Sequence, residues 1–278
     1  MTVELYDPNI SYAAPSGAHL TYRGGPLLKA ARLFGVFIDA GSGYPLVDQM
    51  RSFMKWLITS DVVSGMAEYN VGTGVYVGDA VIKLGGSTPP PPPKDCSAEL
   101  QALIDCIQAG GSIGGGKKKK HASLDLPHRK KLRMASTAVT DAQIQKLIRD
   151  NIKSGVLPSP DSETLFVTFW PSGIVIQYDP QDASCQQFCG YHSNDGKNYY
   201  AVLPYPDCAG CTGGMSVLDA LTSVTTHEIC EAVTDPVPGS GWYDDQNGEI
   251  GDICAWQTRV DAGWTVQEEW SNEKNACI

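Results

Sequence analysis

The stretch Thr226-His227-Glu228-Ile229-Cys230-Glu231-Ala232-Val233-Thr234-Asp235-Pro236 combines acids and a histidine with the end of a predicted helix. Upstream, Ser216 and Asp219 have the spacing of a capping box, in which a hydroxyl and an acid satisfy the first backbone N–H groups. Apolar residues then recur at helical spacing. Pro236 ends the pattern because proline lacks an N–H and restricts the residue before it. The sequence therefore predicts a helix from about residue 217 to about residue 234.

His227 and Glu231 are four residues apart, so they lie on the same face of this helix. An imidazole and a carboxylate in that position can bind one divalent ion. Glu228 follows His227, as the general base does in the His-Glu-x-x-His zinc helix, and Glu231 replaces the second histidine. The alternative is a helix end with solvated acids. The apolar surroundings favour a metal site, because buried acids need partners.

A second acidic cluster downstream can complete this site. Glu249 and Asp252 follow a turn-rich loop that begins at Trp242. Either acid is a candidate third ligand beside His227 and Glu231. Zinc is the ion that we expect, and calcium is the alternative, because a shell that also included Asp235 would be rich in oxygen.

Charge and composition exclude some classes of protein. The chain has 278 residues, 42% of them hydrophobic, and a net charge of −10. This acidity argues against binding to nucleic acid. No apolar run reaches the roughly 18 residues of a membrane span. The first residues show neither the basic nor the apolar region of a signal peptide.

Cysteine usage points to an oxidising compartment. Nine cysteines are many for a cytosolic chain. Two close pairs, Cys185/Cys189 and Cys208/Cys211, are typical of a disulfide framework, with a zinc knuckle as the alternative. A cysteine near the end, Cys277, predicts a staple of the tail. An odd count leaves at least one thiol free or paired between chains. We expect an extracellular protein.

Composition divides the chain into three parts. Residues 1–21 are predicted to form an extended arm. Residues 22–86 and 137–278 are predicted to form a single α/β core domain. Residues 87–136 are predicted to be an insertion with a short helix, because they contain a run of five prolines, a glycine-rich linker and lysine clusters.

Local patterns predict the elements of the core. Strands are expected at 32–39, 165–170, 174–178 and 199–204, with 165–178 read as strand–turn–strand. Helices are expected at 46–59 and from Thr140 to about Lys153, and residues 69–84 as a hairpin or a twisted edge. Residues 185–192, including His192, are expected to form a loop. The fold class is a mixed α/β sheet with a zincin-like metal-binding helix, in one domain stapled by disulfides.

Several short motifs together resemble secreted bacterial and fungal proteins that are distantly related to the plant phosphate-induced (Exordium-like) proteins. The matching stretches are Tyr22 to Pro26, Phe188 to His192, Cys208 to Cys211, Thr226 to Pro236, Gly241 to Tyr243, and Glu249 to Cys254. They cover most of residues 20–85 and 137–278, and the insertion departs from the pattern. The resemblance implies a secreted, cell-wall-associated protein, and it leaves metal chemistry open because this chain keeps His227, Glu228 and Glu231.

Two functions follow from these observations. The first is a zinc-dependent hydrolase, most plausibly a metallopeptidase, with His227 and Glu231 as ligands, Asp252 or Glu249 as the third, and Glu228 as general base. In that reading His192 donates to the oxyanion. The second is a non-catalytic extracellular protein with a structural ion, which binds cell-wall polymer or assembles with itself.

Overall fold

The computed structural model describes residues 2–84 and 137–278. These residues form one compact unit. The predicted insertion at 87–136 lies outside the described residues. The predicted division into arm, core and insertion stays a prediction.

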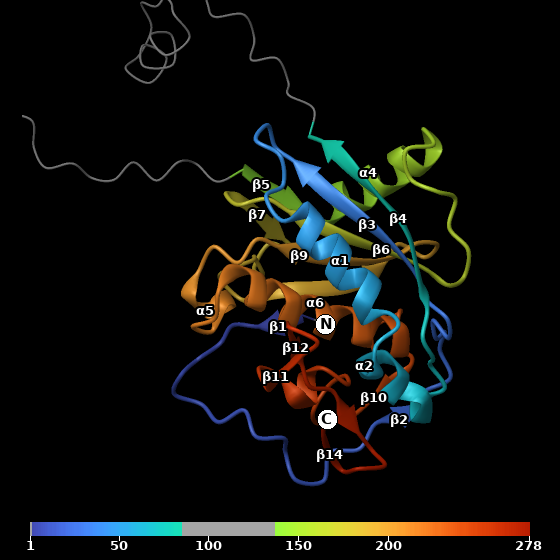
Figure 1. The fold of residues 1–278 in the computed structure, drawn as a ribbon, viewed down its shortest axis with the longest axis vertical. Coiled ribbons are helices and arrows are strands. Elements are labelled where there is room, and N and C mark those ends of the chain that lie inside the picture. The colour runs from blue at the N-terminus through green and yellow to red at the C-terminus, as the bar shows by residue number, and fades with distance from the viewer. Residues whose placement is uncertain (1, 85–136) are drawn as a thin grey trace, which may run out of the picture. The chain divides into compact units, whose positions relative to one another are not determined.

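A six-stranded mixed sheet, with the strand order β1-β8-β9-β6-β3-β4, organises the described chain (Figure 1). Its strands are β1 (Thr2–Glu4), β8 (Phe188–Asn194), β9 (Tyr199–Pro204), β6 (Thr164–Trp170), β3 (Arg32–Asp39) and β4 (Val75–Lys83). Strands β4, β3, β6 and β9 are parallel, whereas β8 is antiparallel to β9, and β1 is antiparallel to β8. The predicted mixed α/β class is therefore confirmed.

Several predicted elements appear at their expected positions. β3 has the predicted bounds, and so does α6 (Val217–Thr234), whose N-cap Ser216 accepts a hydrogen bond from the backbone N–H of Asp219. α4 (Asp141–Lys153) begins at Thr140, which forms a capping box with Gln143. α1 (Val47–Leu57) is slightly shorter than predicted. The spacing of apolar residues and the helix-capping residues predict these elements correctly, because both depend only on nearby positions in the chain.

Two local predictions are corrected. The hairpin alternative for residues 69–84 is wrong, because β4 is a single edge strand parallel to β3, preceded by α2 (Asp61–Ser64) and a 3₁₀ helix, η1 (Gly65–Tyr69). The strand–turn–strand at 165–178 is confirmed as β6, a turn and β7 (Ile174–Gln177), although β7 leaves the sheet and pairs with β5 (Thr137–Thr140). The loop at 185–192 contains most of β8, so His192 lies on a strand that the antiparallel pairing with β9 holds.

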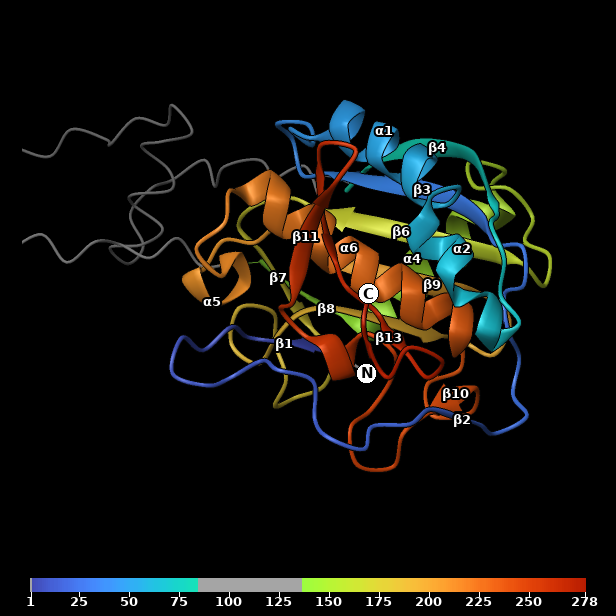
Figure 2. The same cartoon turned by 60° about the horizontal axis from the view of Figure 1, so that its bottom comes forward.

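The helices cover both faces of the sheet. α6 contacts β8 and β9 on one face, and α1 lies on the same side, while α4 lies on the other (Figure 2). Asp141 at the start of α4 anchors that helix, because its Oδ1 accepts hydrogen bonds from the hydroxyls of Tyr191 and Tyr200 at 2.7 and 2.9 Å.

The C-terminal hairpin closes over α6 from the side away from the sheet. It consists of β11 (Thr258–Asp261) and β12 (Trp264–Gln267), and β12 contacts α6 along its length. Two short strands follow, β13 (Trp270–Ser271) and β14 (Ala276–Cys277). α6 is thus enclosed between the sheet and the tail of the chain.

Three disulfides staple the unit: Cys185–Cys208, Cys189–Cys211 and Cys254–Cys277. The expected framework and the staple of the tail are confirmed, and the zinc-knuckle alternative is wrong because its sulfurs are bonded to each other. Cys230 is a buried free thiol. Three disulfides indicate an oxidising, extracellular setting. Within residues 2–84 and 137–278, no helix is both long and apolar enough to span a membrane.

The Cys254–Cys277 bridge closes a separation of 23 residues and fixes the tail under α6. Replacing both cysteines by serine should destabilise the protein by about 2–5 kcal/mol and lower Tm by roughly 5–15 °C, because the unfolded chain gains freedom. Differential scanning calorimetry measures this. The control is the same scan of wild-type protein with its disulfides intact, and an unchanged Tm in the double variant would show that the bridge is dispensable.

Candidate metal centre

α6 is a helix with charged residues on a buried surface. Every residue from Ala220 to Thr234 is buried, and this run includes His227, Glu228 and Glu231. Among the described residues, none of the three forms an ion pair with lysine or arginine; their ion-pair partners are each other, His192 and Asp252. Burial of carboxylates without cationic partners is costly. The site therefore has the electrostatic character of a cation-binding site.

The first group of potential ligands is His227, Glu231 and Asp252. Their nearest ligand atoms all lie within 4.8 Å of one another. His227 Nε2 lies 2.9 Å from Glu231 Oε1 and 3.9 Å from Asp252 Oδ1. Despite the short distance, Nε2 makes no hydrogen bond of acceptable geometry in the described structure. A buried ring nitrogen that lies close to two carboxylates without a hydrogen bond to either has the position expected of a metal ligand.

The second group is His192, Glu228 and Glu231. His192 Nδ1 lies 3.4 Å from Glu228 Oε2 and 3.4 Å from Glu231 Oε2. His192 Nε2 lies 3.1 Å from the carbonyl oxygen of Asp235. All three side chains are essentially inaccessible to solvent. The two groups share Glu231, which directs Oε1 to His227 and Oε2 to His192.

The structure thus brings together all six site residues predicted from the sequence. It separates the two candidate third ligands: Asp252 lies beside His227, whereas Glu249 lies beside His192, with 3.5 Å between Glu249 Oε1 and His192 Nε2. Asp235 is engaged differently, since its carboxylate accepts backbone hydrogen bonds from Gly239 and Gly241.

Two neighbours of the site carried no signal in the sequence. The side-chain nitrogen of Gln267 on β12 lies 2.8 Å from His227 Nδ1 and 2.9 Å from the carbonyl oxygen of Gly251. Glu269 follows two residues later, and it is buried with neither carboxylate oxygen hydrogen-bonded to any described nitrogen or oxygen. No spacing rule links either residue to α6, because the tertiary fold alone brings the tail there.

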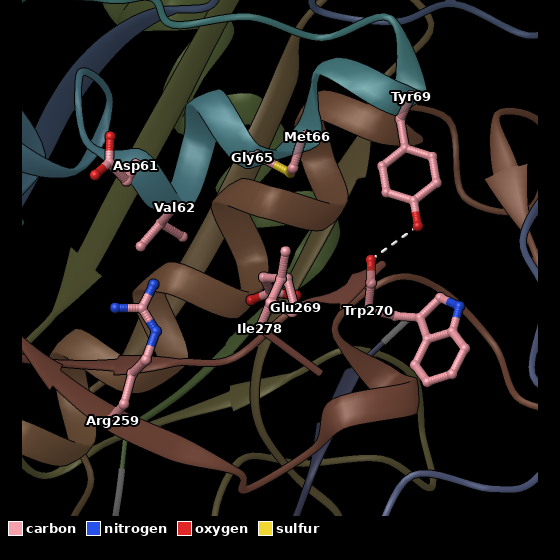
Figure 3. Close-up of a pocket in the computed structure, with 9 residues that line it drawn as sticks. All are labelled: Asp61, Val62, Gly65, Met66, Tyr69, Arg259, Glu269, Trp270 and Ile278. Carbon is pink, nitrogen blue, oxygen red and sulfur yellow. Dashed lines mark hydrogen bonds between the residues drawn. The ribbon is translucent and has the colours of Figure 1, made fainter. Parts of the chain in front are cut away.

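Glu269 faces a separate, small cavity of about 90 Å³ between α2, η1 and the C-terminal strands (Figure 3). Arg259 and Asp61 also line it, and the Tyr69 hydroxyl donates to the Trp270 carbonyl oxygen at its side. Burial raises the pKa of Glu269 well above its usual range, and the Cys230 thiol contacts the carboxyl group. Burial therefore favours the neutral form of the Glu269 carboxyl group.

Burial and neighbouring charges shift the pKa values of the site. Burial, followed by the charge of Glu231, raises the pKa of Asp252 to about 8. Burial also raises the pKa of Asp235, to about 7. Burial opposes ionisation of Glu231 as well, but His227 and His192 outweigh it and lower the pKa of Glu231. Glu231 is therefore the carboxylate that is held ionised between the two histidines.

A cleft of about 640 Å³ reaches only one of the two groups. Its lining includes His227 and Asp252, and the Asp252 side chain is 20% exposed. Neither His192 nor Glu228 lines the cleft. The rest of the lining is aromatic, acidic and amide-bearing, and includes Glu4, Tyr12, Tyr178, Asp182, Tyr243, Asp245, Gln246, Asn247 and Trp256. The His227 group therefore borders the cleft, with Asp252 as its partly exposed member, and the His192 group is closed.

Glycines allow the backbone to approach both groups. A Cβ on Gly251 would lie 2.7 Å from His227 Nδ1, and a Cβ on Gly190 of β8 would lie 2.8 Å from Glu228 Oε1. The side chains of His227 and Glu228 therefore occupy the space that a Cβ on Gly251 or Gly190 would need. The Asp252 N–H then reaches Glu231 Oε1 at 3.2 Å.

These donor sets suit a metal ion. Among the described residues, His227 Nε2 in the first group, and Glu228 Oε1 and Glu231 Oε2 in the second, are buried without a hydrogen-bond partner. Imidazole with carboxylate is a common ligand combination for divalent ions. No family model, curated protein or solved structure matches this chain.

Gly251→Ala should disrupt the site without a change of charge. The added methyl would clash with the His227 ring, and such overpacking costs about 1–3 kcal/mol. We expect a lower Tm and weaker binding of zinc in isothermal titration. Gly65→Ala is the matched control, because its Cβ would meet only Ile278 Cδ1, at 3.9 Å. Equal behaviour of the two variants would mean that the close approach of Gly251 is unimportant.

Proposed function

We propose that the protein is a metal-dependent hydrolase, whose ion binds to His227, Glu231 and Asp252 at the inner end of the cleft. The observation that carries this proposal is the position of His227. Its Nε2 is buried, lies close to two carboxylates without a hydrogen bond, and belongs to a residue that lines a cleft large enough for a substrate. Three protein ligands with access from a cleft are typical of catalytic rather than structural metal sites.

Zinc is the ion that we propose for this position, since one imidazole and two carboxylates are familiar zinc ligands. A bound zinc ion supplies Lewis acidity and lowers the pKa of water toward neutrality. The His-Glu-x-x-Glu helix resembles the helices of zinc peptidases in its spacing. We therefore propose a peptidase as the first class to test.

The chain's own residues orient the ligands. The Gln267 side-chain amide lies 2.8 Å from His227 Nδ1. If His227 held an ion through Nε2, its ring proton would be on Nδ1, and the amide oxygen of Gln267 could accept that N–H. Such a partner fixes the tautomer and orientation of a metal-binding histidine. The Asp252 N–H holds Glu231 Oε1 in place at the same time.

The sequence-based roles of Glu228 as general base and His192 as oxyanion donor stay predictions. Both side chains are buried against β8 rather than exposed in the cleft. The proposal requires only the three ligands and the cleft.

The cleft lining favours a neutral or cationic polymer. Among residues 2–84 and 137–278, four carboxylates line it, those of Glu4, Asp182, Asp245 and Asp252, and no lysine or arginine does. Aromatic side chains supply flat apolar surface for peptide or sugar rings. The outer edge of β8 is already paired with β1, so a peptide substrate must lie in the cleft itself or displace β1.

A non-catalytic protein with a structural ion is the second candidate. The closed group formed by His192, Glu228 and Glu231 favours it, because structural ions are fully enclosed by protein ligands. Its partner would be a cell-wall polymer or another copy of the chain. Zinc bound without any hydrolytic activity is its expected signature.

The decisive experiment measures metal and hydrolysis on the same samples. Wild-type protein is stripped with a chelator, reloaded with zinc, and incubated with a peptide library and with cell-wall polysaccharides. We expect cleavage only after reloading. Asp252→Asn should lower zinc affinity by more than the roughly 10–100-fold typical of outer-shell changes and abolish cleavage.

Asp48→Asn serves as the control, because the Asp48 side chain is 89% exposed and forms an ion pair with Arg51 on the surface of α1. It should bind zinc and cleave like wild type. Zinc-loaded wild-type protein that cleaves no member of either library would contradict the hydrolase and support the structural ion.

A further inference from the structure

We propose that His192, Glu228 and Glu231 form a second position for a small divalent ion, and that Glu231 serves both positions, one through each carboxylate oxygen. The inference does not depend on hydrolysis. It assigns Glu228 and His192, which the proposed function leaves without an established role, to a closed site between α6 and β8.

The His192 ring is oriented toward the two glutamates. Nε2 lies 3.1 Å from the Asp235 carbonyl oxygen, so an N–H at Nε2 has an acceptor. If an ion replaced the proton on Nδ1, the Nδ1 lone pair would face Glu228 and Glu231. Histidines that bind metals characteristically donate their other ring N–H to a carbonyl or carboxylate. The imidazole is therefore oriented for coordination without any rearrangement.

The distances from His192 Nδ1 to the two carboxylates match those between ligands of one ion. Nδ1 lies 3.4 Å from Glu228 Oε2 and 3.4 Å from Glu231 Oε2. Charge-assisted N–H···O bonds are typically about 2.7–2.9 Å long. In contrast, ligands about 2.0–2.1 Å from a tetrahedral ion are separated by about 3.3–3.4 Å. The separations therefore fit ligands around an ion better than an ion pair between a protonated histidine and two carboxylates.

Two carboxylate oxygens in this group lack hydrogen-bond partners among the described residues. Glu228 Oε1 and Glu231 Oε2 are inaccessible to solvent and have no acceptable hydrogen-bond partner within residues 2–84 and 137–278. Such atoms in a buried site cost free energy unless a cation or water satisfies them. The backbone of Gly190 packs directly against Glu228, so a side chain there would displace the carboxylate.

The ligand set defines the class of ion. One nitrogen and two carboxylates suit zinc or manganese, whereas calcium prefers six to eight oxygen ligands. The site is closed, so its ion would tie β8 to α6 and neutralise acids that pair with no lysine or arginine in the described part of the chain. Because Glu231 contacts both histidines through different oxygens, it would bridge the two ions.

The test counts bound zinc in full-length variants by native mass spectrometry after chelation and reloading. Counts are compared between variants, because His121 and His128 elsewhere in the sequence can also bind zinc. We expect His192→Gln and Glu228→Gln each to hold one ion fewer than wild type. Glu231→Gln should hold two fewer. His19→Gln, at an exposed histidine, is the matched control and should keep the wild-type count.

If both His192→Gln and Glu228→Gln bind as many zinc ions as wild type, the proposal is overturned. If Glu228→Gln keeps the wild-type number of ions but loses cleavage, the result supports Glu228 as the general base. The isosteric Glu228→Gln variant keeps the test valid should His192→Gln fail to fold, which circular dichroism would reveal. Manganese-loaded protein adds a second readout: we expect the spin-coupled spectrum of a carboxylate-bridged pair in wild type and its loss in His192→Gln.

The two proposals can fail separately. If Asp252→Asn keeps the wild-type count while His192→Gln loses one ion, the closed position stands and the open catalytic position is wrong. If only Asp252→Asn loses an ion, the open position stands and the closed position is wrong.

Discussion

The burial of charged side chains along α6 is the constraint on which the structure depends. Ala220 to Thr234 are enclosed on all sides, yet the run contains a histidine and two glutamates. Apolar contacts favour this burial, whereas the loss of water around the carboxylates opposes it. The two can coexist only if the fold supplies partners for the acids. The elements that pack on α6 are therefore also the elements that build the site.

Those partners come from two directions. β8 brings His192 to the sheet side of the helix, and the segment from Gly248 to Asp252 brings a carboxylate and a backbone N–H to the other side. Gly190 and Gly251 allow these backbones to come close because neither has a side chain. The Cys254–Cys277 bridge fixes the second segment to the tail. This disulfide thus helps to hold Asp252 in position beside His227 and Glu231.

Glu231 connects the open and the closed sides of this centre. One of its oxygens faces His227, which lines the cleft, and the other faces His192, which is sealed under β8. Access to solvent separates the two sides more clearly than ligand type does, since each has one imidazole and carboxylates. This difference in access is the reason for proposing a catalytic ion on one side and a structural ion on the other.

The sequence alone determined the helix and its ends, because the Ser216 cap, the apolar period and Pro236 act within a few residues of the chain. It also determined that His227 and Glu231 share a face, since helical geometry fixes that relation. Only the tertiary structure decided that His192 lies on an antiparallel strand, that Asp252 rather than Glu249 lies beside His227, and that Gln267 and Glu269 approach the site. The site contacts of His227 with Asp252 and with Gln267 join residues 25 and 40 positions apart, and no local period encodes them. They form because the sheet, the helix and the tail bury their apolar faces against one another.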